Sequence, residues 1–250
     1  MNVIVLDTET TSLDKPFCYD CSWIIMETET GSLIDLKANV IEQVWHNLPL
    51  FESAYYKEKR QKYISMMRVK HAQMNKWGYV MQDLKRDIRK YNIEAVYAYN
   101  ADFDDKVLSY NCDWYKCQNP FDNIPIFDIW GYASQFITNT PDYKNFCEQF
   151  ERFTDTGNYK GSAEVVYQYL THQPDFIEEH MGLFDSEIEA SILYQCVQLG
   201  AEWNHEYKVN KILPRPTVTP FTVKVNGENI YEGEYIKKYV RNNTYSFTTP

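Results

Sequence analysis

The sequence lacks a long hydrophobic run: no segment approaches the ~20 consecutive apolar residues of a membrane-spanning helix. Its N-terminus also lacks the basic and then apolar pattern of a signal peptide, so we expect a cytoplasmic location and no membrane partner. Basic residues are scarce, 25 against 35 acidic ones, and the net charge of −10 argues against a protein that coats nucleic acid nonspecifically. Acidic clusters that bind metal reverse their sign locally, so this charge still allows an enzyme that contacts a few nucleotides.

The sequence also lacks cysteine pairs with a histidine nearby, the pattern of many zinc sites. The six cysteines are Cys18, Cys21, Cys112, Cys117, Cys147 and Cys196. Cys18 and Cys21 have a spacing that zinc sites use, but no histidine lies near them or near the pair Cys112 and Cys117. We therefore expect free thiols, as in a reducing cytosol, rather than a zinc site.

The chain does have enough apolar residues for a large core. Hydrophobic residues make up 44% of its 250 residues and aromatic residues 16%, which predicts a globular protein of one large domain or two small ones. Apolar runs predict strands at 3–6, 22–28, 33–40, 95–99 and 124–129. The turn-rich tetrapeptide 29–32 makes the second and third of these an antiparallel hairpin. Helices are expected over 50–91 (with Gly78 as a candidate break), 102–109 and most of 130–200, which predicts an α/β fold.

The tail from Leu213 has a different composition. Pro214, Pro216 and Pro220 predict a stiff linker, and the alternating segment 221–225 before Asn226-Gly227 predicts a hairpin. We therefore divide the chain into residues 1–207 and a linker with a small β appendage at 208–250.

The first predicted strand carries the most informative pattern. It ends in Asp7-Thr8-Glu9, and carboxylates at positions i and i+2 of a strand lie on one face. Two like charges at the end of a buried strand are costly unless a cation neutralises them, and Mg²⁺ prefers oxygen ligands of this kind. The alternative is a strand end that runs into a polar turn, with Asp7 as a simple cap.

A second acidic group follows the strand predicted at 95–99. Asp102, Asp104 and Asp105 begin a helix there, at the strand end where open α/β sheets generally bind ligands. The alternative for each of them is the ordinary preference of acidic residues for a helix N-terminus, and Asp102 is expected to be that cap.

A third acidic position lies on a helix that should be buried. At 100° per residue, Asp185 shares a core-facing stripe with Ile188, Ile192, Cys196 and Leu199. The segment 162–185 contains no Lys or Arg that would neutralise it, which favours a metal or another functional demand over a buried ion pair. His180 alone would be an ordinary surface or core histidine, but beside Asp185 it is a candidate base that deprotonates water.

Taken in order, these residues resemble the three exonuclease motifs of the DEDD 3′–5′ exonuclease superfamily: Asp7-Thr8-Glu9, then Asn100 with Phe103-Asp104, then His180 with Asp185. The histidine resembles the DEDDh branch, to which ribonuclease T and the proofreading subunit of bacterial replicative polymerase belong, whereas Met181 stands where the tyrosine branch has its tyrosine. The likeness runs from Met1 to about Leu199, and residues 160–180 are also similar to exonucleases of bacteriophages and prophages. Ser12 and Ser186 depart from the family's usual Gly and Ala, which bears on substrate fit.

The resemblance implies a ribonuclease H-like mixed sheet, with an antiparallel first hairpin and later parallel strands flanked by helices. It implies two divalent ions, Mg²⁺ or Mn²⁺, held by Asp7, Glu9, Asp104 and Asp185, with His180 as general base. The implied reaction releases nucleoside 5′-monophosphates from the 3′ end of single-stranded nucleic acid, with DNA favoured over RNA, in a bacterial or phage-infected cell. By the same likeness, contacts to the terminal nucleotide are expected from Thr10, Leu13, Asn100 and Phe103.

One segment also has the composition of a nucleic-acid-binding surface. Glu58 is the lone acid among the basic residues Lys57, Lys59, Arg60, Lys62, Arg68, Lys70 and Lys76, and the aromatic residues Tyr55, Tyr56, Tyr63 and Trp77 accompany them. Cations and aromatic faces suit single-stranded nucleic acid, although a solvated helix with long lysines is the alternative for any single residue. RNA trimming, or a catalytically silent relative that binds nucleic-acid ends or a replication partner, remain alternatives for the function.

Overall fold

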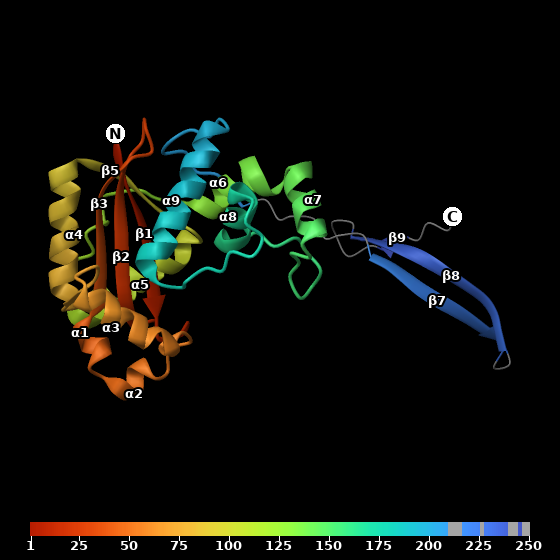
Figure 1. The fold of residues 1–250 in the computed structure, drawn as a ribbon, viewed down its shortest axis with the longest axis horizontal. Coiled ribbons are helices and arrows are strands. Elements are labelled where there is room, and N and C mark those ends of the chain that lie inside the picture. Colours follow the sequence, from red (N-terminus) through yellow and green to blue (C-terminus); the bar gives the residue numbers. More distant parts are fainter. Residues whose placement is uncertain (210–216, 226–227, 240–244, 247–250) are drawn as a thin grey trace.

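The structure is a computed structural model that describes residues 1–209, 217–225, 228–239 and 245–246. Its central element is a six-stranded sheet with helices on both faces (Figure 1). In their order across the sheet, the strands are β4 (Gln73–Asn75), β3 (Leu33–Ile41), β2 (Cys18–Glu27), β1 (Asn2–Thr10), β5 (Ile93–Ala98) and β6 (Ile126–Asp128). Within the described part of the chain, no helix is both long and apolar enough to cross a membrane.

The strand directions confirm the predicted mixed sheet. β1 pairs antiparallel with β2, and β2 pairs antiparallel with β3. β5 runs parallel to β1, β6 parallel to β5, and β4 parallel to β3. Because β1 and β5 are parallel, their C-terminal ends lie at the same edge of the sheet. Asp7 and Glu9 at the end of β1 therefore lie near the start of α5 (Ala101–Tyr115), which follows β5.

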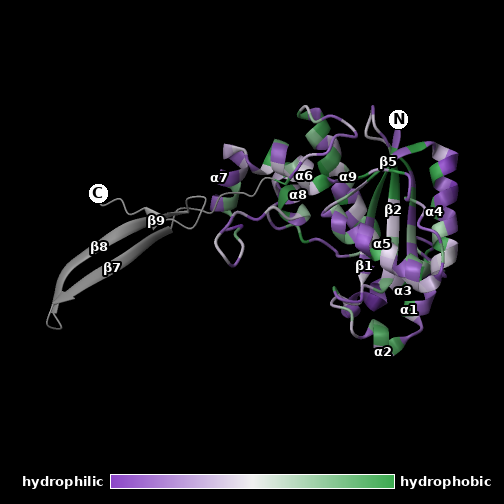
Figure 2. Ribbon diagram, turned by 180° about the vertical axis from the view of Figure 1, so that it is seen from behind, coloured by the Kyte–Doolittle hydropathy of each residue, from purple (hydrophilic) through white to green (hydrophobic). Residues whose placement is uncertain are grey.

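The two faces of β1 pack into different cores. Side chains alternate along a strand, and Ile4 and Leu6 pack in a cluster that includes residues of α4 (Trp77–Tyr91) and α5. Val3 and Val5 pack in a second cluster, with residues of α9 (Gly182–Gln198). In Figure 2, α4 turns a largely hydrophilic surface outward, as expected of a helix that buries only one face.

The remaining helices complete the two layers. They are α1 (Glu42–Trp45), α2 (Leu48–Phe51), η1 (Lys57–Lys59), α3 (Arg60–Arg68), α6 (Ile129–Ala133), the π-helical η2 (Ser134–Thr138), α7 (Pro141–Gln149) and α8 (Ala163–Thr171). Both α6 and α8 pack against α9. The six cysteines are unpaired, in agreement with the prediction of free thiols.

Two of the predicted helical regions are interrupted. In the region 50–91, β4 separates α3 from α4, and Gly78 lies inside the first turn of α4 instead of breaking a helix. β4 has only three residues and forms by pairing with the end of β3, where Asn75 donates a hydrogen bond to Asn39 (3.0 Å). In the region 130–200, residues 150–162 and 172–181 are not helical.

The C-terminal strands are β7 (Thr217–Val225), β8 (Glu228–Tyr239) and β9 (Tyr245–Ser246), which form a separate three-stranded sheet. β7 and β8 are antiparallel, as predicted, while the Asn226-Gly227 turn and the prolines Pro214 and Pro216 lie outside the described residues. Pro220 was expected in the linker but lies in β7, an edge strand of this sheet, where a residue without an N–H group is tolerated. The division of the chain near residue 207 stays a prediction.

Candidate active site

The alternation of side chains along β1 determines which face of the sheet Asp7 and Glu9 occupy. Asp7 and Glu9 continue the series of Val3 and Val5 and face α9, while Thr8 continues the opposite series and faces α5. In the antiparallel register, Glu9 lies opposite Asp20 of β2. The predicted carboxylate pair therefore shares one face of the sheet.

α9 brings Asp185 to this face. The residue is buried, with 4% of its surface exposed, and its Oδ1 atom has no hydrogen-bond partner among the residues that the structure describes. Ile188, Ile192 and Cys196 are buried on the same helix, as predicted. The prediction for Leu199 was wrong: this residue is 52% exposed, because α9 ends at Gln198 and Leu199 leaves the helical stripe.

The first turn of α5 contributes Asp104. Of the three candidate aspartates only Asp104 is buried, and it accepts a hydrogen bond from the Thr8 hydroxyl (2.7 Å). Asp102 is exposed in the first turn of α5, in agreement with the predicted preference of acidic residues for a helix N-terminus, while the N-cap position itself is Asn100, in a left-handed conformation (φ +64°). Asp128 accepts the backbone N–H of Asn100 (2.8 Å) and so fixes this turn.

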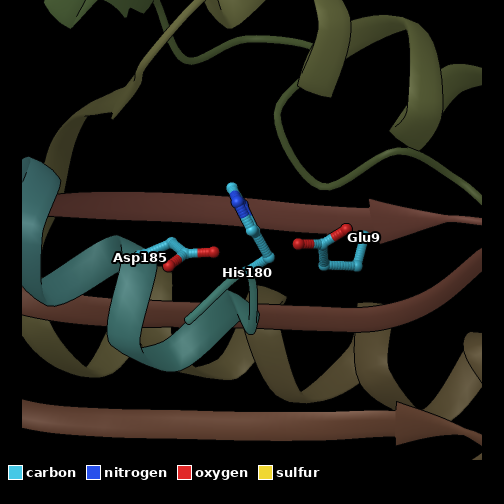
Figure 3. A group of neighbouring side chains, drawn as sticks. All are labelled: Glu9, His180 and Asp185. Atoms are coloured by element: carbon cyan, nitrogen blue, oxygen red, sulfur yellow. The ribbon is translucent and has the colours of Figure 1, made fainter. Parts of the chain in front are cut away.

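His180 lies on the loop before α9, two residues from the helix start. Its imidazole rises between the carboxylates of Glu9 and Asp185, and one ligand atom of each residue lies within 4.8 Å of the others (Figure 3). Burial lowers the pKa of His180 below its usual value, which favours the neutral imidazole that accepts a proton.

These side chains open onto one cavity of about 860 Å³. Asp7, Glu9, Asp185 and His180 line it, whereas Asp104 lies just behind Thr8. The four residues expected to contact the terminal nucleotide also line this cavity: Thr10, Leu13, Asn100 and Phe103. The structure thus brings together nearly all the residues that the sequence singled out.

The acidic side chains are poorly compatible with one another in the absence of a cation. Burial raises the pKa of Glu9 to about 9 and that of Asp185 to about 8, and neighbouring carboxylates add to both rises. Burial, reinforced by the charges of Glu189 and Asp185, raises the pKa of Asp7 well above its usual range. The pKa of Asp104 rises to about 7 through burial, against the hydrogen bond from Thr8. A divalent cation would restore the ionised forms, and the unpartnered Oδ1 of Asp185 is an oxygen donor placed for one.

Three further residues at the site were missed by sequence reasoning. Glu189 and Glu178 add carboxylates to the cavity, and Asp20 lies opposite Glu9. Tyr56, predicted only as an aromatic residue of the basic segment, lies against His180. Glu189 is four residues after Asp185 and hence on the same helical face, so the helical period could have identified it. Asp20 is recognisable only from the pairing of β1 with β2, which no local pattern gives.

The basic segment lies beside the cavity, and several of its cations have internal partners. Lys59 and Lys62 form ion pairs with Glu179, and Lys57 pairs with Glu52. The guanidinium of Arg60 lies over the ring of Trp45, 4.2 Å from its centroid. These cations therefore stabilise the fold through internal contacts. Binding of a polyanion by this segment stays a prediction.

The fold can be compared with those of known proteins. No family model matches the sequence, and no curated protein does. Among solved structures, a full-length 3′-exonuclease matches with a TM-score of 0.54 and 14% identity over 100% of this chain and 95% of the other. A 3′-exonuclease described in 3′-end specific recognition of a histone mRNA stem-loop matches with a TM-score of 0.53 and 12% identity, over 100% of this chain and 74% of the other. The nuclease domain of 3′hExo, a DEDDh family member bound to rAMP, gives a TM-score of 0.42 and 13% identity over 85% and 97%.

The first two of these similarities show that the chain has the α/β fold of 3′-exonucleases. At 12 to 14% identity they establish the fold alone.

Proposed function

We propose that this protein is a metal-dependent 3′–5′ exonuclease of the DEDDh type. The observation that carries the proposal is the convergence of Asp7, Glu9 and Asp185 with His180 in one cavity, on the fold of 3′-exonucleases. These residues come from two distant parts of the chain, the end of β1 and the start of α9 with the loop before it. Among the described residues no lysine or arginine pairs with these carboxylates, and a shared function accounts for buried acids that meet in this way.

Asp7, Glu9, Asp104 and Asp185 are the residues that would hold divalent ions, with Mg²⁺ or Mn²⁺ the fitting metals because all the donors are carboxylate oxygens. When bound, such ions stabilise the charge that develops on a phosphodiester during hydrolysis. His180 would take a proton from the attacking water, a role supported by its nearness to Glu9 and Asp185. Thr8 holds the Asp104 carboxylate in position through its hydroxyl.

The substrate proposed is the 3′ end of single-stranded nucleic acid, which releases nucleoside 5′-monophosphates. Exposed Leu13 and the aromatic residues Phe103 and Tyr55 give the cavity apolar surface on which bases can stack. DNA remains the substrate predicted from sequence. RNA is the second candidate, since a structural neighbour is described in recognition of an mRNA 3′ end. The setting expected is the cytoplasm of a bacterial or phage-infected cell.

Labelled oligonucleotides test the proposal directly. Single-stranded DNA and RNA, labelled at either end, are incubated with the protein and Mg²⁺, with and without chelator. We expect stepwise shortening from the 3′ end that chelator abolishes and that Asp7→Asn lacks. Hydrolysis by Asp7→Asn, or chelator-resistant hydrolysis, would refute the assignment, and binding of ends without any hydrolysis would favour a silent relative.

A further inference from the structure

Residues 55–62, which we call the clamp segment, lie against the loop that carries His180. This loop has an unusual backbone, because His180 adopts φ +49°. A left-handed conformation is unfavourable for a residue with a side chain and persists where surrounding contacts stabilise it. The clamp segment supplies such contacts to His180 and to the residue before it.

The first contact is an aromatic stack. The phenol ring of Tyr56 lies flat on the imidazole of His180, with ring centroids 4.2 Å apart and an angle of 11° between the planes. Tyr55 packs edge-on against Tyr56 from the solvent side and is 84% exposed. One face of the imidazole is therefore covered, which restricts rotation of a side chain that is otherwise one-third exposed.

The second contact consists of two ion pairs made by Glu179, the residue before His180. Glu179 binds Lys59 (3.9 Å), the last residue of η1, and Lys62 in the first turn of α3. Arg60, between these lysines, is fixed to the core, since its guanidinium lies over Trp45 and, at 5.0 Å, over Phe51. The clamp segment is thus anchored to the protein interior at the point where it holds the histidine loop.

We propose that Tyr56 is a positioning residue for His180: its stacked ring, supported by the ion pairs of Glu179, holds the imidazole between Glu9 and Asp185. This inference rests on the proposed function, because it gives the imidazole a task that needs a fixed orientation. A misplacement of about 1 Å at a reacting group can cost up to about 100-fold in rate. The clamp therefore contributes to turnover without touching the reacting atoms.

A double-mutant cycle tests the proposal on the oligonucleotide that the wild type degrades. Tyr56→Ala removes the stack, Tyr56→Phe keeps it, and Glu179→Gln weakens the ion pairs. We expect Tyr56→Ala to lower kcat by about 10- to 100-fold with KM little changed. Tyr56→Phe should retain most of the activity, and Glu179→Gln should lose a few-fold. In the His180→Ala background, measured with excess enzyme, Tyr56→Ala should cause no further loss.

An NMR measurement tests the stacking of Tyr56 on His180 without relying on enzymatic activity. The imidazole protons of His180 lie over the Tyr56 ring, so their NMR signals should be shifted upfield in the wild type and in Tyr56→Phe, and should lose this shift in Tyr56→Ala. Equal losses from Tyr56→Ala with and without His180 would instead assign Tyr56 to substrate stacking and overturn the proposal, as would the absence of the NMR shift. If no oligonucleotide is hydrolysed, the proposed function fails, and the NMR shift alone decides whether Tyr56 positions the imidazole.

Discussion

Replacing Asp185 with Asn removes a buried titratable carboxyl from the metal-free protein while keeping the shape of the side chain. In the folded protein the pKa of Asp185 is raised from 3.8 to about 8, by burial first and then by Glu178 and Asp20. The folded state therefore binds this proton more tightly than the unfolded chain. Stability falls as the pH rises from about 4 to about 8, and the cost is fully present above pH 8.

The size of this effect follows from the shift. At pH 7 the penalty spans roughly 3 pH units at ~1.4 kcal/mol each, on the order of 4 kcal/mol. A buried amide carries its own desolvation cost of about 1–3 kcal/mol. Asp185→Asn should thus stabilise the metal-free protein by about 1–3 kcal/mol, which corresponds to a rise in Tm of roughly 2–12 °C for a domain of this size.

Thermal unfolding in the presence of EDTA measures the gain, and it should shrink toward zero at pH 5. Mg²⁺ should reverse the order, because metal at about 100 times its Kd stabilises the wild type by ~2.7 kcal/mol and the variant far less. Asp105→Asn, the same change at an exposed position of α5, should leave Tm unchanged. A metal-free Asp185→Asn protein less stable than the wild type at pH 7, or one that Mg²⁺ stabilises equally, would refute the reasoning.

Three other predictions concern the same cavity. Asp7→Asn should abolish hydrolysis, with the fold shown intact by circular dichroism. Residual turnover above 1% of the wild type, which means a barrier raised by less than about 3 kcal/mol, would contradict its role. His180→Ala should lower the rate by ~10²–10⁴ while Mg²⁺ binding, followed by calorimetry, is kept; an unchanged rate would place the base elsewhere. Thr8→Val removes the donor to Asp104 and should raise the pKa of that carboxyl further and weaken metal affinity by about 10- to 100-fold, which a metal titration would detect.

Local periodicity accounts for what the sequence predicted well. The period of two along β1 placed Asp7 and Glu9 on one face, and the period of 3.6 along α9 placed Asp185 on a buried stripe. Both periods hold wherever a strand or helix is covered by the core. The helical period no longer applies after α9 ends at Gln198, and Leu199 is exposed for that reason.

Features that depend on pairing between distant segments could not be predicted from local sequence patterns. β4 exists because three residues meet the end of β3, and the place of Asp20 depends on a register between β1 and β2. The stack of Tyr56 on His180 joins residues far apart in the sequence. Composition marked residues 57–76 as basic, but it could not show that Lys59 and Lys62 bind Glu179.

Asp20 and Asp185 contrast a carboxylate with internal donors and one proposed to bind a metal. Both are buried and both raise the pKa of Glu9. Asp20 accepts hydrogen bonds from Tyr63 (2.7 Å), from Ser22 and from the backbone N–H of Gly182 (2.9 Å), and Gly182 lacks the Cβ that would crowd this contact.

Those three donors satisfy the Asp20 carboxylate within the protein and fix the start of α9 on the sheet. Within the described residues, no donor contacts the Oδ1 atom of Asp185, three residues further along the same helix. Since buried polar atoms are nearly always paired, this carboxylate oxygen beside Glu9 supports the proposal of a divalent cation, the partner that its chemistry fits.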